Sequence, residues 1–219
     1  MSDDLRMGLE GGRIRAEISF SALLAAERAA GGPGPVEVSI AGRPILTRAR
    51  EPGSDGALAV SFPAPIRAAA VAGAPMRFTL LGPRRTALIG ERAFRPASDP
   101  SELSLALNLR PEAATIRGWA VGPGAEDRRF ALFVDDAYVE TRRLETRRDD
   151  VAAVTPPEQR LNGLSFPAPA SLYDGRPHVL SVVETSALLI ARNGPVVFTP
   201  ATLRDALLAR ARHLASAPV

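Results

Sequence analysis

The sequence lacks both cysteine and lysine, so all 27 of its basic residues are arginine. Without cysteine, the chain can form neither a disulfide framework nor a thiolate site for metal binding or catalysis. The arginines only slightly exceed the 24 acidic residues, and the formal net charge is +3. Aromatic residues make up only 5% of the chain, whereas proteins that bind single-stranded nucleic acid usually interleave basic and aromatic side chains. We therefore expect no nucleic-acid partner.

Histidine is also scarce, because His178 and His213 are the only two in the chain. A protein zinc site needs three or four histidine, cysteine or carboxylate ligands. The sequence contains no glycine-rich phosphate loop and no nucleophile elbow. A Ser-His-Asp set built from His178 and Asp174 would lack that elbow and the oxyanion glycines. We therefore predict a non-enzymatic chain without metal or other cofactor, in which His178 is structural.

Long apolar runs are missing as well. No segment approaches the roughly 18 apolar residues of a membrane-spanning helix. The start of the sequence, "MSDDLRMGLEGG", has neither the basic beginning nor the apolar core of a secretory signal. We expect a soluble protein without a membrane span, cytoplasmic by default.

An internal repeat is the most informative feature that is present. The motif Ser-Phe-Pro-Ala-Pro occurs at 61–65 and again at 165–169, and similar flanking residues follow in the same order. The aligned pairs are Ile14 with Ile116, Arg15 with Arg117, Ala41-Gly42 with Asp135-Asp136, Gly73 with Gly175, and Pro75 with Pro177. This order predicts two copies of one module. The first copy has a helix-like insertion near 21–32, with Ser21 and Gly31 as its caps, and the second has extra residues within 146–164.

Alternation of apolar and polar residues dominates both copies and predicts short strands. "RIRAEISF" and "SLALNL" each place their apolar residues on one face, and Asp135-Asp136 fits a two-residue hairpin turn. We predict an all-β fold of two tandem immunoglobulin-like β-sandwich domains, related by internal duplication, plus a short C-terminal α-helix. The predicted boundaries are 1–97 for copy one, 98–200 for copy two and 201–219 for the helix, with 95–102 as the linker.

The C-terminal segment has helical periodicity. Its apolar residues are Leu203, Leu207, Ala211 and Leu214, with arginines on the remaining surface. Thr199 or Thr202 could cap the helix. This stripe must pack either on the second module or on a partner chain, and the sequence leaves both alternatives open.

The second copy resembles β-sandwich accessory domains associated with bacterial glycosyltransferases and methyltransferases. The matching motifs are Gly118-Trp119-Ala120, Val134-Asp135-Asp136, Arg148-Asp149-Asp150-Val151-Ala152, Gly163, Phe166, and Asp174-Gly175 with His178. The hairpin departs from the family pattern in having Asp-Asp rather than Asp-Gly. The first copy matches only through the repeat. The resemblance implies a β-sandwich fold and a role linked to glycan or cell-envelope processes.

Two functions follow as expectations. The first is a non-catalytic binding or accessory module whose partner is another protein or a glycan. Its candidate surface consists of Tyr138, Arg142, Arg143, Arg147, Arg148 and Tyr173, with both tyrosines exposed for sugar stacking and Trp119 in the core. The charged run 140–150 is more typical of a solvated edge strand, because acidic residues are interleaved with its arginines. The alternative is a structural subunit of a larger assembly, a homo-oligomer among the options, that docks through the C-terminal helix or sheet edges.

Overall fold

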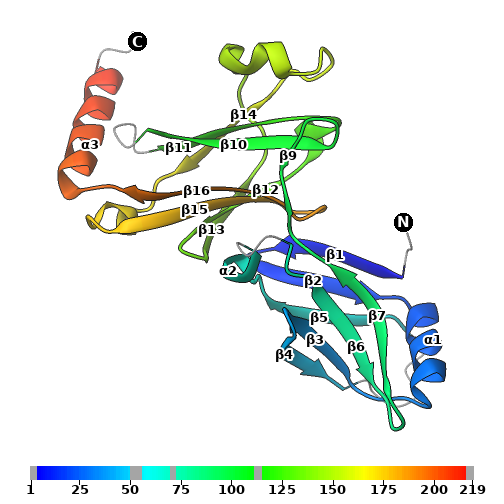
Figure 1. The fold of residues 1–219 in the computed structure, drawn as a ribbon. Coiled ribbons are helices and arrows are strands. Elements are labelled where there is room, and N and C mark those ends of the chain that lie inside the picture. Colours follow the sequence, from blue (N-terminus) through cyan, green and yellow to red (C-terminus); the bar gives the residue numbers. More distant parts are fainter. Residues whose placement is uncertain (1–3, 50–55, 70–72, 111–114, 216–219) are drawn as a thin grey trace. The chain divides into compact units, whose positions relative to one another are not determined.

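The computed structural model describes residues 4–49, 56–69, 73–110 and 115–215, and strands are its main regular element (Figure 1). The chain divides into two compact units. Unit 1 comprises residues 1–95 with 186–188, and unit 2 comprises residues 96–185 with 189–219. The mostly β fold class predicted from the sequence is therefore correct.

Unit 1 contains two antiparallel sheets and two helices. The strands are β1 (Leu5–Glu10), β2 (Arg13–Ile18), β3 (Val36–Ile40), β4 (Arg43–Arg48), β5 (Leu58–Pro63), β6 (Met76–Leu81) and β7 (Thr86–Arg92); the helices are α1 (Phe20–Ala30) and α2 (Ile66–Ala69). One sheet has the order β1-β2-β5 and the other β4-β3-β6-β7. In β2, Ile14, Ala16 and Ile18 are buried and the residues between them are exposed, as expected when successive side chains point to opposite faces of a strand.

Helix α1 is the insertion predicted near 21–32. Its N-cap is Ser19 rather than Ser21, because the Ser19 hydroxyl accepts a hydrogen bond from the N–H of Ala22. Ser21 instead lies within the first turn. The predicted C-cap Gly31 is correct, with φ of 83°, a conformation that glycine adopts without a steric penalty.

Unit 2 contains two further sheets. Its strands are β9 (Ser98–Asp99), β10 (Leu103–Arg110), β11 (Thr115–Val121), β12 (Phe130–Val134), β13 (Ala137–Arg142), β14 (Gly163–Pro167), β15 (Pro177–Glu184) and β16 (Leu189–Val197). Short 3-10 helices are η2 (Ala125–Asp127), η3 (Asp149–Val154) and η4 (Ala170–Tyr173). The sheet orders are β14-β11-β10-β9 and β13-β12-β15-β16-β8, the last strand being β8 (Arg95–Pro96). In Figure 1, β10, β11 and β14 form one layer of this unit, and β12, β15 and β16 form the other.

The strand orders of the two units correspond element by element. The β1-β2-β5 order matches β10-β11-β14, and β4-β3-β6-β7 matches β13-β12-β15-β16. The β3–β4 hairpin of unit 1 and the β12–β13 hairpin of unit 2 each have a register shift at the corresponding place, after Val38 and after Leu132. Such bulges are retained features of a fold rather than accidents.

The strand pairing corrects one part of the sequence alignment. Ile40 pairs with Met76, whereas the equivalent Val134 pairs with Leu180. Met76 on β6 therefore corresponds to Leu180 on β15. This differs by two residues from the sequence alignment, which places Pro75 on Pro177. A shift by two keeps each side chain on its original face of the strand, so the apolar pattern alone did not detect it.

The predicted linker 95–102 contains regular structure, in the form of two short strands. Residues Arg95–Pro96 form β8 and Ser98–Asp99 form β9, which pairs with β10. The Asp99 carboxylate also accepts hydrogen bonds from the N–H and hydroxyl of Ser101.

The C-terminal helix α3 spans Pro200–Ala215, and the N–H of Thr202 donates to the hydroxyl of Thr199. Figure 1 shows that it extends away from the sheets of unit 2, and its packing is against η4. Leu203 is half-buried, Ala211 is exposed, and the side chain of Leu214 lies outside the described set. Leu207 and Leu208 are 53% and 49% exposed, so packing on the second module covers only the beginning of the apolar stripe.

No helix among the described residues is both long and apolar enough to span a membrane.

Candidate ligand-binding site

His178 lies between two carboxylates at one end of unit 2. Its Nδ1 is 2.5 Å from Asp135 Oδ2, and its Nε2 is 2.9 Å from Asp174 Oδ1. The His178 side chain is 9% exposed, whereas those of Asp135 and Asp174 are 50% and 41% exposed. The imidazole is therefore enclosed, while each carboxylate keeps one side open to solvent.

Two turns position these residues. Asp135 and Asp136 form the β12–β13 turn with φ of 48° and 70°, a left-handed conformation that aspartate tolerates better than most residues. The second oxygen of Asp135 accepts a hydrogen bond from the N–H of Val179 at 2.9 Å. Asp174 ends η4 and accepts from the N–H of Arg176 at 2.8 Å. His178 thus clamps the β12–β13 turn to the turn that precedes β15.

The clamp favours the charged form of all three groups. The hydrogen bond to Asp135 and then that to Asp174 raise the pKa of His178 against the effect of burial. Burial opposes ionisation of Asp135, but the Val179 N–H and His178 outweigh it and lower the pKa of this carboxyl. The N–H of Arg176 and then His178 lower the pKa of Asp174. The contacts therefore favour an imidazolium held between two carboxylates.

A hollow of about 480 Å³ opens beside this clamp. It is lined by Val134, Asp135, Ala137, Tyr138, Val139, Pro169, Ser171, Asp174 and His178. The Tyr138 side chain is 38% exposed, its ring packs edge-on against Phe133 at 5.8 Å, and its hydroxyl is 3.1 Å from that of Thr141. These contacts hold the ring in one orientation at the hollow.

The imidazole of His178 is poorly placed to act as a general base in this arrangement. A general base needs a ring nitrogen within reach of the proton it abstracts, and both nitrogens of His178 face carboxylates. The outward lone pairs of the two carboxylates are good acceptors for ligand hydroxyl groups. Among the described residues, no group of three or more histidine, aspartate or glutamate side chains is placed to hold a metal ion.

The structure separates the residues predicted to form one surface. Tyr138 lies at the hollow, but Tyr173 is 4% exposed and packs edge-on against Phe198. The prediction that Tyr173 is an exposed stacking platform is therefore wrong, because η4 turns its ring inward. Trp119, predicted to be in the core, is only half-buried.

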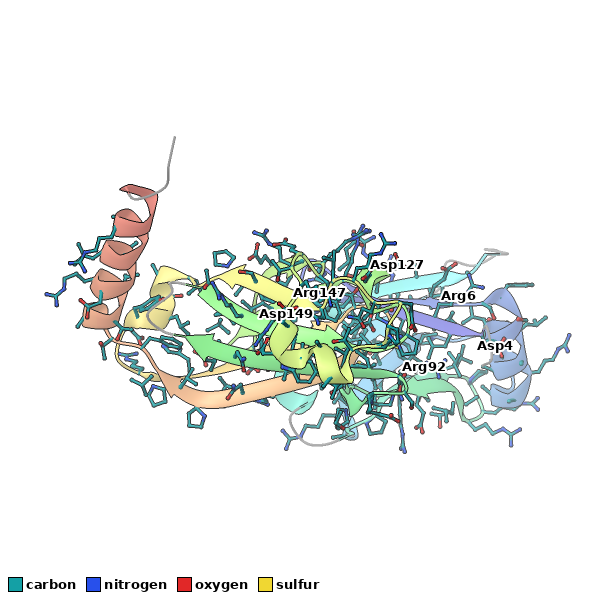
Figure 2. All side chains as sticks on the ribbon, turned by 90° about the horizontal axis from the view of Figure 1, so that it is seen from above. Asp4, Arg6, Arg92, Asp127, Arg147 and Asp149 are labelled. Carbon is teal, nitrogen blue, oxygen red and sulfur yellow. The ribbon has the colours of Figure 1, made fainter. Side chains whose placement is uncertain are left out.

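The four candidate arginines differ in their surroundings. Arg142 lies on the edge strand β13, and the hydrogen bonds that it donates to Glu140 and then to Glu145 raise its pKa. Arg143 is exposed. Arg147 Nε is 3.3 Å from Asp149 (Figure 2), and Arg148 forms an ion pair with Asp150. The edge strand predicted for the run 140–150 is correct only as far as Arg142, where β13 ends. Ion pairs within the run neutralise much of its charge.

Most of the segment predicted as extra, 146–164, forms a well-anchored stretch of unit 2 at 146–162. Asn162, which is 2% exposed, accepts from the N–H of Arg148 at 2.6 Å and donates to the Arg148 carbonyl at 3.1 Å. Gln159 donates to the carbonyls of Ala120 and Leu161, both at 2.8 Å. Buried amides with satisfied partners hold a loop in one conformation, so Arg148 has a fixed backbone.

Sequence reasoning did not identify the pairing of Asp135 with His178. The available signal was the aspartate at Asp135 in the hairpin turn and the presence of Asp174 four residues before His178. Neither the protein-family models nor the curated proteins compared with this sequence match it. The geometry of the site therefore carries the functional argument.

Proposed function

We propose that this chain is a non-catalytic binding module, and that unit 2 binds a glycan in the hollow beside Tyr138. The observation that carries the proposal is the combination of a fixed, exposed tyrosine ring with two partly exposed carboxylates around one hollow of about 480 Å³. Sugar rings present apolar C–H faces that pack on aromatic rings, and their hydroxyl groups donate to carboxylates.

The clamp supports this function by preorganising the acceptors. His178 and two backbone N–H groups fix the carboxylates of Asp135 and Asp174 before a ligand arrives. Rigid groups lose less conformational entropy on binding, which favours affinity. Because the positive imidazolium partly neutralises the pair, an uncharged polyol fits this site better than a cation does.

The two units also bear on the wider role. We infer that they are copies of one immunoglobulin-like β-sandwich module, supported by their common strand order and equivalent bulges. Asp135-Asp136 replaces Ala41-Gly42, so only the second copy has this clamp. The role that fits is that of an accessory module for a glycan-related or envelope-related enzyme.

Replacing Tyr138 with alanine is expected to weaken glycan binding roughly tenfold, because it removes the stacking surface and retains the clamp. A glycan microarray of bacterial surface oligosaccharides would find the ligand, and calorimetry on the full chain would measure its affinity. Tyr138→Phe keeps the ring and should bind within about twofold of the original chain.

Leu88→Ala in unit 1 is the matched control, since Leu88 is another exposed apolar side chain outside the site. An array without any bound glycan, or a Tyr138→Ala variant with undiminished affinity, would refute the site.

A second candidate function is that of a structural subunit that associates with another copy of itself through α3. The exposed Leu207 and Leu208 favour it, because a helix with uncovered apolar side chains gains stability on burial. We expect the full chain to be a defined oligomer by light scattering after size exclusion, and a version ending at Pro200 to be a monomer. Two monomers of equal stability would eliminate this candidate.

A further inference from the structure

A second hollow in unit 2, separate from the Tyr138 site, is rich in arginine. It has a volume of about 480 Å³ and is lined by Asn108, Arg117, Thr146, Arg147, Arg148, Asp150, Leu164 and Ser165. We call the surface formed by Asn108, Arg117, Arg147, Arg148 and Ser165 the arginine groove. Three guanidinium groups line it with only one carboxylate.

Three of these side chains share one line across the sheet. Arg117 on β11 pairs with Asn108 on β10 and with Ser165 on β14. Directly paired residues project from the same face of a sheet at close spacing. Arg117 and Asn108 are exposed, and Ser165 is half-buried. An amide, a guanidinium and a hydroxyl therefore lie side by side on this face.

Unit 1 has an arginine and a serine at the equivalent positions, with Gly8 in place of Asn108, but both polar side chains are already engaged. Arg15 pairs with Gly8 and Ser61, and its Nε is 2.8 Å from Glu10 Oε2. The Ser61 hydroxyl accepts a hydrogen bond from Arg13 at 3.0 Å. In unit 1, the sequence thus supplies internal partners for both the arginine and the serine.

Unit 2 has lost both of those partners. The strand pairing places Arg110 at the position of Glu10, and Thr115 at the position of Arg13. Among the residues that the structure describes, Arg117 has no ion pair with a carboxylate. Its charge and the polar groups of Asn108 and Ser165 are therefore available to a ligand.

The segment 146–162 forms the remaining wall of the groove. Arg148 Nε donates to Asp150 Oδ1 at 3.0 Å, and Arg148 Nη1 donates to the Gly118 carbonyl at 3.4 Å. Asp150 and Asp149 offset the charges of Arg148 and Arg147, so the excess positive charge of the groove resides on Arg117. The two paired arginines still present guanidinium N–H donors to a bound anion.

We propose that the arginine groove binds an oxyanion, with Arg117 as its charge partner and Asn108 and Ser165 as hydrogen-bond donors. Both a phosphate ester and the carboxylate of a uronic acid present this chemistry, because guanidinium binds either group through paired N–H donors. The groove is independent of the Tyr138 site, and each proposal can fail without the other.

The test is a titration of the full chain with inorganic phosphate at low ionic strength, followed by NMR of backbone and arginine Nε–H signals. We expect saturable shifts at Arg117 and Ser165, and roughly tenfold weaker binding in Arg117→Ala. Arg15→Ala is the matched control, since Arg15 occupies the equivalent position in unit 1. It should leave phosphate binding unchanged.

Arg110→Glu gives a second, independent variant. It restores the acidic residue found at the equivalent position of unit 1 and should also weaken phosphate binding. Equal losses in Arg15→Ala and Arg117→Ala would overturn the proposal, because they would show binding by net charge alone. The proposal would also be overturned if the NMR shifts of the original chain saturated with neither inorganic phosphate nor glucuronate.

Glucuronate, methyl phosphate and methyl glucoside distinguish the sources of the anion. Tighter methyl phosphate binding would assign a phosphate ester, and tighter glucuronate binding would assign a uronic acid. Methyl glucoside should not shift the Arg117 signal, and a shift equal to that caused by the anions would count against a charge-based site. Tyr138→Ala should bind phosphate as the original chain does, which separates this test from that of the glycan site.

Discussion

Phe166→Ala is expected to lower the free energy of unfolding of unit 2 by about 4 kcal/mol, because a large aromatic side chain leaves a cavity that its neighbours fill only partly. Phe166 is completely buried on β14 and pairs with Ile116 on β11. Phe62 is its counterpart in the repeated motif, is 3% exposed and pairs with Ile14. Phe62→Ala should destabilise unit 1 by a similar amount.

The single tryptophan allows these effects to be assigned. Trp119 lies on β11 of unit 2, so its fluorescence reports the unfolding of that unit, whereas circular dichroism reports both units. In urea, Phe166→Ala should move the fluorescence transition to lower denaturant concentration. Phe62→Ala should change the dichroism transition and leave the fluorescence midpoint in place. Equal movement of the fluorescence midpoint in both variants would mean that the units unfold together, and losses below about 1 kcal/mol would contradict the packing argument.

The His178 clamp should make the stability of unit 2 depend on pH in a defined direction. The pKa of His178 is raised in the folded state, so its stabilisation is complete below the unfolded value of about 6.5 and is lost as the pH rises through the folded pKa. The pKa values of Asp135 and Asp174 are lowered. Their stabilisation is present above about pH 4 and is lost as the pH falls through their folded pKa values.

The contribution of the clamp is therefore greatest between about pH 4 and about pH 6.5. Within this window, His178→Ala should cost about 2 kcal/mol, because it removes two charge-assisted hydrogen bonds. Unfolding followed by Trp119 fluorescence at about pH 5.5 and about pH 9 would measure the difference. The original chain should be more stable at the lower pH, and the variant should lose most of this difference.

His213→Ala is the matched control for this experiment, because His213 is the only other histidine. It should retain the pH dependence of the original chain. If His178→Ala retained it as well, another group would have to be responsible, and the clamp would not be the source.

Much of the fold could be predicted from the sequence because its signals are local. Alternation in "RIRAEISF" predicted a strand with Ile14, Ala16, Ile18 and Phe20 on one face. Strand β2 buries the first three, but it ends at Ile18, and Phe20 is an exposed residue at the start of α1. The Asp135-Asp136 turn and the Gly31 cap depend on the φ preferences of residues within a few positions, and both are correct. The first three residues of the repeated Ser-Phe-Pro-Ala-Pro motif end β5 and β14, which occupy corresponding positions in their sheets.

The sites depended on contacts between residues far apart in the chain. Asp135 and His178 are separated by 43 residues, and the register of β12 on β15 decides whether they meet. The offset of two residues in that register leaves the apolar pattern unchanged, so periodicity carries no record of it. The inward orientation of Tyr173 also depends on a contact between distant residues. Its ring packs against Phe198, which directly follows β16, and the sequence near Tyr173 does not specify this contact.

The sequence by itself determined most of the strands, several turns and the absence of cysteine chemistry, because each depends on residue type and short-range spacing. The tertiary structure alone decided that His178 bridges two carboxylates, and that Arg117 shares one line with Asn108 and Ser165. Strand pairing brings those residues together, and pairing is a property of the folded chain rather than of any short segment.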